Sequence, residues 1–271
     1  MAGTEDDVTR HYTHGGLEQA IRDGLAKLGQ EAGPAATDDL AFVDEFHLGG
    51  RQATLDLAAA LDLRPGTEVL DVGCGIGGAA RVLAGRFGCR VVGIDLTPEY
   101  VQVAQALTAA LGLAGQVEHR VASATALPFP DASFDTATML HVGMNIEDKT
   151  ALGRGVHRVL RPGGTFAVYD VMRVGAGELR YPVPWASRPE ISFLAEPEVY
   201  RRALADAGFT IVSERDRREL AIDFLYRMRA RVTESGPPPL GLHLLMGGDA
   251  RAKVGNILAA LEAGVVAPIE L

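Results

Sequence analysis

The chain has 271 residues, of which 47% are hydrophobic and 23% charged, a composition typical of a folded globular domain and not of a disordered or fibrous chain. Its 26 basic and 35 acidic residues give a formal net charge of −9, which disfavours nucleic acid as the main partner. Two cysteines, Cys74 and Cys89, exclude a disulfide scaffold and a four-thiolate zinc site and favour a reducing compartment. Without an apolar run of roughly 20 residues or a signal-peptide core, the sequence predicts a cytoplasmic protein that binds no membrane.

The first part of the chain, residues 1–64, has helical patterning and no predicted strand. Apolar residues at helical spacing predict a helix over 17–28, and a second helix is predicted over 51–63 before a Pro-Gly pair. Between these helices, residues 31–39 contain Gly, Pro and Asp and predict a loop. We expect residues 1–64 to form a helical lid on the core that follows.

Short apolar strands alternate with helices between residues 65 and 172. This alternation is typical of an open parallel α/β sheet, in which helices cover both faces and the strands are therefore continuously apolar. Strands are predicted over 68–72, 90–95, 117–121, 134–140 and 165–171, and helices over 77–87, 98–111 and 149–160.

The last part, residues 173–271, is less regular. Four prolines and the only tryptophan lie between 174 and 197, which favours a loop or lid over a substrate. We expect one domain over residues 1–271, whose last part holds this substrate lid, inserted helices and the last strands. Helices are predicted over 197–207, 220–232 and 250–263, and strands over 209–213 and 264–271, the last at a sheet edge because of Pro268.

A glycine-rich loop, within VLDVGCGIGG (69–78), joins the first predicted strand to the next helix. Glycines there allow a sharp turn and a close approach of the backbone to a ligand. Asp95 ends the second strand, where an acid can accept hydrogen bonds from two ribose hydroxyls. The alternative is a tight turn that binds nothing, but the placement of Asp95 favours a site for a nucleoside-containing cofactor.

Two cofactors fit this loop. Gly73, Gly75 and Gly78 match the dinucleotide pattern G-x-G-x-x-G, and Asp95 serves either cofactor. Asp71 favours S-adenosylmethionine, because a carboxylate repels a pyrophosphate but attracts an ammonium and a sulfonium; capping of the loop by Asp71 is the alternative. An NAD(P)-dependent oxidoreductase and a non-catalytic S-adenosylmethionine-binding protein therefore stay open as alternatives to a methyltransferase.

Four motifs in order, VLDVGCGIGG, VVGIDLTPEYV, ATALPFPDASFD and LRPGGTFAVYD, span roughly residues 67–172 and resemble the class I S-adenosylmethionine-dependent methyltransferases, in particular methyltransferase type 11. DEFHLGGRQAT (44–54) and YPVPWA (181–186) are similar to sarcosine/dimethylglycine N-methyltransferases. The resemblance implies a doubly wound, Rossmann-like, seven-stranded and mostly parallel sheet with a reversed last strand. It also implies methyl transfer to a nitrogen or oxygen of a small-molecule acceptor, such as a glycine-betaine-pathway-like amine or a natural-product intermediate.

The resemblance also implies where the cofactor binds. It places Gly73, Gly75 and Gly77 along the methionine part of the cofactor, with Cys74 as a small side chain in the same loop. Arg51 carries a charge that suits the cofactor carboxylate, although a solvated helix arginine is an equal alternative.

The nucleoside part has its own implied contacts. Asp95 holds the ribose hydroxyls and Leu96 flanks the adenine. Ser123 and Ala124 stand where the family has Gly-Asp-Ala before Leu-Pro-Phe, so that a serine hydroxyl replaces the acid that accepts the adenine amino group. Leu140 and His141 are implied to lie under the cofactor near the transferred methyl group.

Methyl transfer needs alignment and exclusion of water, and a general base is optional. Candidate catalytic residues are His141, Asn145 and Tyr12. His141 binding a loop carbonyl and Asn145 capping a helix are the alternatives. No His/Cys/carboxylate group has metal-ligand spacing, so we expect no metal. A homodimer is compatible with the sequence, which does not identify the acceptor.

Overall fold

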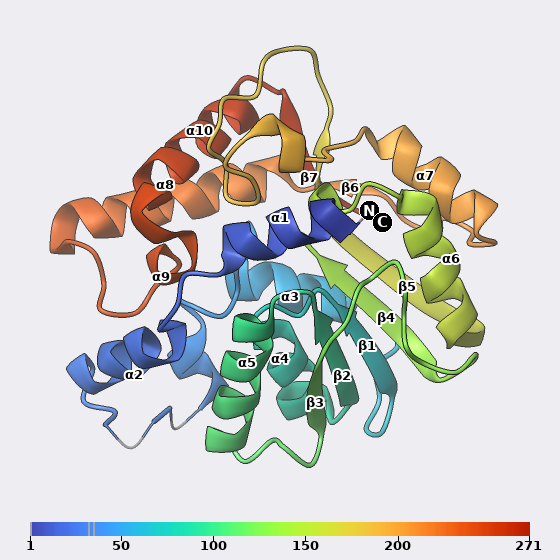
Figure 1. The fold of residues 1–271 in the computed structure, drawn as a ribbon, viewed down its shortest axis with the longest axis horizontal. Coiled ribbons are helices and arrows are strands. Elements are labelled where there is room, and N and C mark those ends of the chain that lie inside the picture. The colour runs from blue at the N-terminus through green and yellow to red at the C-terminus, as the bar shows by residue number, and fades with distance from the viewer. Residues whose placement is uncertain (1, 32, 35) are drawn as a thin grey trace.

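The computed structural model describes residues 2–31, 33–34 and 36–271, and its centre is a seven-stranded sheet with the order β3-β2-β1-β4-β5-β7-β6 (Figure 1). Strands β1 to β5 pair in parallel, and β7 runs antiparallel to both β5 and β6. This confirms the predicted mostly parallel sheet with its reversed last strand. The strands are β1 (Glu68–Val72), β2 (Arg90–Asp95), β3 (Val117–Val121), β4 (Phe134–Leu140), β5 (Leu160–Arg173), β6 (Arg215–Asp216) and β7 (Val266–Glu270).

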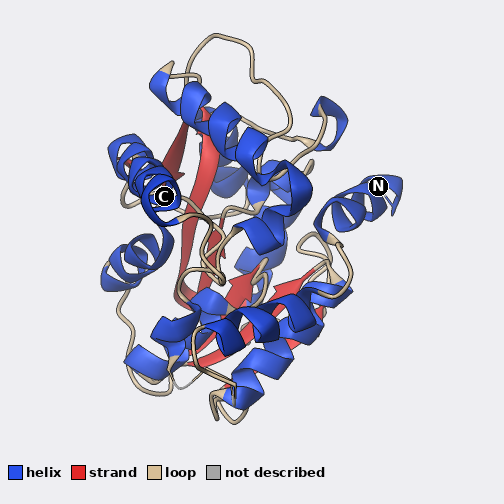
Figure 2. Cartoon of the chain, turned by 90° about the vertical axis from the view of Figure 1, so that its left-hand side faces the viewer, coloured by secondary structure: helices blue, strands red, loops and turns tan. Residues whose placement is uncertain are grey.

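Helices lie on both sides of the strands, as Figure 2 shows. In Figure 1, α1 lies between the α8–α10 group and the part of the molecule that contains α3 to α5. None of the described helices is long and apolar enough to cross a membrane. The helices are α1 (Ala2–Tyr12), α2 (Leu17–Lys27), α3 (Gly50–Ala59), α4 (Gly78–Phe87), α5 (Pro98–Ala110), α6 (Lys149–Val159), α7 (Pro197–Asp206), α8 (Arg218–Ser235), α9 (His243–Met246) and α10 (Ala250–Glu262).

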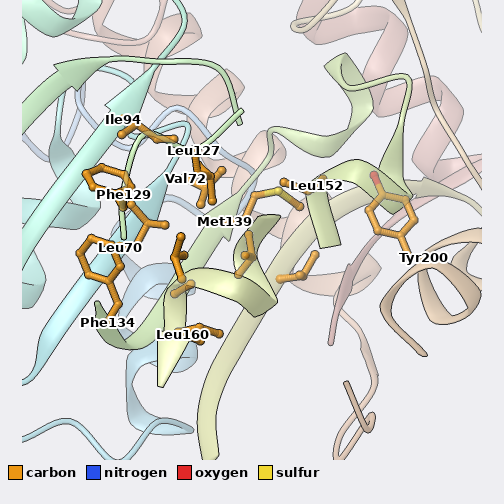
Figure 3. Close-up of a cluster of buried hydrophobic side chains, with 14 of the residues drawn as sticks. Leu70, Val72, Ile94, Leu127, Phe129, Phe134, Met139, Leu152, Leu160 and Tyr200 are labelled. Carbon is orange, nitrogen blue, oxygen red and sulfur yellow. The ribbon is translucent and has the colours of Figure 1, made fainter. Parts of the chain in front are cut away.

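The main core lies between the central strands and the helices on one face of the sheet (Figure 3). Leu70 and Met139 from neighbouring strands are fully buried, and Leu152 of α6 packs against the same cluster. Each fully buried side chain of this size stabilises the fold by about 1.5–3 kcal/mol relative to an exposed one. This packing fixes the strand ends, and with them the loops that follow.

The two N-terminal helices, α1 and α2, differ in how they pack. In α2, Leu17, Ile21 and Leu25 are buried with Leu107 of α5, so this helix packs against the core that it covers. Helix α1 is polar and was not predicted; Val8 is its buried apolar residue among those described. The predicted loop over 31–39 ends in a 3-10 helix, Thr37–Leu40, while residues 32 and 35 lie outside the described part of the chain.

Two predicted strands need correction. The sixth strand was predicted over 209–213, but β6 is Arg215–Asp216, because Phe209 packs on His157 of α6 instead of joining a ladder. The last strand lies between β5 and β6 and not at the sheet edge. Pro268 is tolerated there because β6 pairs only with the two residues after it.

Candidate active site

A cavity of about 740 Å³ opens where the parallel strands β1 to β4 end. Residues that follow or end these strands, among them Gly73, Asp95, Ala122 and His141, form part of its wall. Ligands of doubly wound sheets bind at this edge, and the volume falls within the roughly 300–1,000 Å³ of small-molecule sites. The cavity is therefore the candidate active site.

The glycine-rich loop approaches this cavity closely. Gly73 has φ +72°, and a Cβ atom there would lie 2.3 Å from Val142, so any side chain would collide. Gly75, with φ +54°, donates its N–H to the Asp95 carboxylate at 2.9 Å. Cys74 also lines the cavity. Gly77 does not: a Cβ there would meet Arg81 at 2.7 Å, so this glycine is required by packing behind the loop.

Asp71 presents an unsatisfied carboxylate to the cavity. Its Oδ1 accepts a hydrogen bond from Thr138 at 2.9 Å, and its Oδ2 is buried with no hydrogen-bond partner in the described part of the chain. Burial raises the pKa of Asp71 to about 7. An unpartnered buried acceptor costs about 1–3 kcal/mol, which a bound ammonium would remove. The described contacts thus do not support the alternative that Asp71 caps the loop.

Asp95 ties two elements together. Its Oδ2 accepts from Gly75, and its Oδ1 accepts the N–H of Thr97 at 2.8 Å. Burial raises the pKa of Asp95, and these N–H groups oppose that shift. Each carboxylate oxygen keeps a further lone pair for a ligand. Leu96, the next residue, also lines the cavity.

Helix α1 crosses the cavity beyond β2 and β3. Ser123 donates its hydroxyl hydrogen to Glu5 of α1 at 2.6 Å and also contacts Thr125 at 2.9 Å. Glu5, Ser123 and Ala124 all line the cavity. Glu5 was not predicted as a site residue, because α1 lacks the apolar periodicity that would have shown a packed helix.

The junction between α1 and α2 is anchored on α5. The carboxylate of Glu99 accepts the backbone N–H groups of His14, Gly15 and Leu17 at 2.9, 3.1 and 3.1 Å. Gly15 and Gly16 both have φ +74°, and each has open space where a Cβ would lie. The end of α1 is thus fixed, while its first turn reaches the cavity.

His141 follows β4 in an unusual conformation. Its φ is +56°, which is rare for a non-glycine residue and often marks functional sites. Its Nδ1 accepts the N–H of Leu48 at 3.3 Å, and its ring stacks on Tyr169 with centroids 4.9 Å apart. The buried Nε2 has no partner among the described residues, and burial lowers the pKa of His141 well below its usual value.

These facts define what His141 can do. A neutral ring that accepts at Nδ1 carries its proton on Nε2, so His141, which lines the cavity, has an unpartnered N–H donor among the described residues. This partner of His141, a backbone N–H, differs from the loop carbonyl that the alternative required. Leu140 lines the cavity beside it.

Asn145 and Tyr12 join three distant segments. Tyr12 donates its hydroxyl hydrogen to Asn145 Oδ1 at 2.8 Å, and Asn145 Nδ2 donates to the carbonyl oxygen of Trp185 at 2.8 Å. The alternative that Asn145 is only a turn or a helix cap is corrected in part: Asn145 ends a 3-10 helix, Gly143–Asn145, but Asp148 caps α6, by accepting the N–H of Ala151 at 2.8 Å. Tyr12, Asn145 and Trp185 all line the cavity.

Arg51 lies elsewhere, and its predicted contact with the cofactor carboxylate is corrected. Its guanidinium pairs with Asp38 at 2.9 Å, with Asp44 at 3.4 Å and with Glu45, and it does not line the cavity. Asp44 and Glu45 are almost fully buried, and buried carboxylates require such partners.

Comparison with protein families matches residues 70–168 to a family described as a methyltransferase domain. The core of this chain is a class I S-adenosylmethionine-dependent methyltransferase domain. The matched residues run from β1 through β5 and include the loop, Asp95 and His141.

Curated relatives share this methyltransferase domain. Phosphoethanolamine N-methyltransferase 1 of Arabidopsis thaliana is 36% identical over 192 residues, which are 68% of this chain and 37% of that protein. The 2-methyl-6-phytyl-1,4-hydroquinone methyltransferase of Synechocystis is 35% identical over 169 residues, 62% of this chain and 48% of that protein. The chain thus spans less than half the length of these relatives.

Solved structures share the fold of the methyltransferase domain. One named as a sarcosine dimethylglycine methyltransferase from Galdieria sulphuraria superposes with a TM-score of 0.68 at 19% identity, covering 93% of this chain and 96% of that one. The [4+2]-cyclase SpnF superposes with a TM-score of 0.65 at 23% identity, over 94% and 95%. The second name shows that this fold also occurs in a protein named for a different reaction.

Proposed function

We propose that this chain transfers the methyl group of S-adenosylmethionine to a small-molecule acceptor. The observation that carries the proposal is the buried, unpartnered Asp71 Oδ2 beside a loop whose Gly73 leaves no room for a side chain. When bound, the cofactor would supply a methyl group activated by a positive sulfur, which an acceptor lone pair could displace without a metal or a covalent intermediate on the protein.

Residues at the ends of different strands bind different parts of the cofactor. Asp71 holds the ammonium, and the backbone of Gly73, Cys74 and Gly75 allows the close approach that the methionine part needs. Asp95 receives the ribose hydroxyls with the lone pairs that Gly75 and Thr97 leave free. Because the sheet order is β3-β2-β1, the adenine end extends past Leu96, which follows β2, toward Ser123 and Ala124 after β3 and toward Glu5 of α1.

The other residues orient the reactants and exclude water. His141 offers its Nε2 hydrogen to the acceptor and so fixes its orientation; as a neutral ring with that proton in place, it does not act as a base. Tyr12 and Asn145 hold α1 and the Trp185 segment over the cavity. Alignment and desolvation of this kind are sufficient for displacement at an already activated methyl carbon.

The test is incubation with methyl-labelled S-adenosylmethionine and an acceptor panel, with detection of labelled product. Because the fold also occurs in a protein named as a cyclase, binding alone is insufficient and label in the product is required. Cofactor binding is measured separately by calorimetry. Binding of NAD or NADP without binding of S-adenosylmethionine would contradict the proposal, and binding without any turnover would favour a non-catalytic protein.

We also propose that the protein is cytoplasmic and acts without nucleic acid. Both cysteines are free and buried, which suits a reducing compartment, and the net charge is −9. Cell fractionation and a filter-binding assay with duplex DNA test these two statements. Light scattering tests the homodimer, for which the structure of one chain supplies no argument.

A further inference from the structure

We infer that the acceptor is a predominantly apolar molecule without a phosphate or carboxylate group, held by one oxygen atom at His141 and by its apolar body against the inserted helices. This inference rests on the proposed function and specifies its substrate class. This acceptor differs from those that the names of the similar proteins give, since phosphoethanolamine and sarcosine each carry an anionic group.

The wall opposite the strand ends is built from the inserted segments. This wall is formed by Pro184 and Trp185 and by residues of α8, α9 and α10. All the described residues of these segments that line the cavity, that is, residues 184–185 and the lining residues within 224–257, are apolar. Among these are Trp185, Phe224, Met228, Leu245, Val254 and Ile257. Such a wall binds apolar surface and gives no polar partner to a charged group.

Two cations line the described part of this cavity, Lys149 and Arg202, and each already has a partner: Lys149 donates to backbone carbonyl oxygens, and Arg202 lies 3.8 Å from Glu198. Lys149 directs its Nζ to the carbonyl oxygens of Ile146 and Phe193, and burial lowers its pKa to about 8. Arg202 is 70% exposed. Burial lowers the pKa of His47 to about 4 and lowers the pKa of His141 well below its usual value, so both rings are neutral.

Several carboxylates line the same cavity. Asp71 and Asp95 lie near the loop, and Glu147 and Asp148 lie beside α6; Asp44 also lines the cavity but pairs with Arg81 at 2.9 Å. A phosphate or carboxylate of the acceptor, held against the apolar wall, would find no hydrogen-bonding partner there and would be repelled by the nearby carboxylates, and both effects oppose its binding. Charge therefore selects against anionic acceptors, while the wall selects for apolar ones.

The polar end of the acceptor is placed by His141. Its Nε2 hydrogen is buried and has no described partner, so a ligand oxygen that accepts this hydrogen would satisfy it. Because the His141 Nε2–H is a donor, a ligand oxygen would satisfy it, whereas a protonated or quaternary amine would not.

The test measures binding and not turnover. Calorimetry first determines the affinity for S-adenosylhomocysteine, and absence of this binding would count against the proposed function itself. With S-adenosylhomocysteine bound, 4-octylphenol is then compared with octylammonium, phosphoethanolamine and sarcosine. We expect 4-octylphenol to bind at least about tenfold more tightly than each of the others. Failure of 4-octylphenol to bind, or tighter binding of any charged probe, overturns the inference.

Variants locate the bound probe. Met228→Lys places a charge on the apolar wall and should weaken 4-octylphenol binding about tenfold while leaving S-adenosylhomocysteine binding unchanged. Val232→Lys, on the same helix but exposed and outside the cavity, is the matched control and should change neither. His141→Ala should also weaken probe binding, and His141→Gln, which can place an amide donor near the same point, should restore part of it. Equal effects of both lysine variants on 4-octylphenol binding would contradict the assigned wall. If Met228→Lys fails to fold, the comparison of the probes on the wild-type protein tests the inference alone.

Discussion

Tyr12 of α1 donates a hydrogen bond of 2.8 Å to Asn145, which lies 133 residues later in the chain. The amide of Asn145 continues this contact to the Trp185 carbonyl oxygen at 2.8 Å. Two side chains thus connect an N-terminal helix, the segment after β4 and the loop of the inserted part. All three border the cavity, so this connection determines how far it is closed.

Replacing Tyr12 by Phe tests this closure. The ring keeps its contacts with Tyr100 and Phe46, but the hydrogen bond to Asn145, worth about 1 kcal/mol, is lost. We expect S-adenosylhomocysteine to dissociate about fivefold faster in stopped-flow measurements. Tyr226→Phe is the control, because Tyr226 bonds Glu262 on the exposed surface away from the cavity. An unchanged dissociation rate in Tyr12→Phe would show that α1 does not retain the cofactor.

Asp71 should make cofactor binding depend on pH. With a pKa of about 7, most Asp71 carboxyls are protonated at pH 6 and most are ionised at pH 8. Because an ammonium binds the ionised form, we expect affinity to be about tenfold lower at pH 6 than at pH 8. Calorimetry at both pH values on wild type and Asp71→Asn checks this. The variant should bind more weakly and lose the dependence; an identical pH profile in both proteins would exclude Asp71 as the group that binds the ammonium.

The same shift affects stability without ligand. The folded carboxyl keeps its proton up to about pH 7, whereas the unfolded one loses it near pH 4. Its contribution to the free energy of unfolding is therefore fully present below about pH 4 and is lost as the pH rises to 7. Denaturant unfolding at pH 5 and pH 7.5 should show a smaller difference in Asp71→Asn than in wild type. A larger or equal difference in the variant would contradict the raised pKa.

Asp95→Ala should lower both cofactor affinity and stability. The change removes the acceptor of the Gly75 and Thr97 N–H groups, which costs about 1–2 kcal/mol of stability, and removes the ribose contact, which weakens binding by about ten- to a thousandfold. Asp135→Ala is the control: Asp135 also accepts a backbone N–H, from Glu68 at 2.9 Å, but lies outside the cavity. It should lower melting temperature alone. A similar affinity in both variants would remove Asp95 from the site.

Glu5 and Ser123 should act as a pair on the cofactor. We expect Glu5→Ala to weaken S-adenosylhomocysteine binding by about five- to tenfold, because it removes the only described carboxylate that α1 directs to Ser123. Asp6→Ala changes an exposed neighbour on the same helix and should have no effect. In the double variant with Ser123→Ala, the losses should be less than additive. Full additivity would mean that the two residues act independently.

Strand patterning predicted the sheet well and the lid poorly, for a physical reason. The residues of β1 to β4 match their predicted ranges, because continuous apolar runs between turn residues have few other ways to be buried. Helix α1 was missed because its sequence is mostly polar, and its place depends on contacts with segments more than 100 residues away, such as Ser123 and Pro184. Local periodicity contains no information on such contacts.

The site shows the same division. Asp71, Gly73, Gly75, Asp95 and His141 follow or end parallel strands, and the sheet brings such positions to one edge, so their presence on the cavity could be expected. The partners of Arg51 could not be predicted from the sequence. Its charge suited a cofactor carboxylate, but the fold places three acids of its own beside it, which no pattern of spacing indicated.

The three backbone N–H groups that Glu99 accepts fix the segment after the C-terminal end of α1, so the helix can rotate only about this end. At 1.5 Å per residue, the helix turn that carries Glu5 lies roughly 13 Å from the segment that Glu99 fixes, whereas Tyr12 lies close to that segment. A small rotation at Gly15 and Gly16 would thus displace the Glu5 end several times farther than the Tyr12 end. A spectroscopic label on the exposed Asp6 position would report such a swing with greater amplitude than any label near Tyr12.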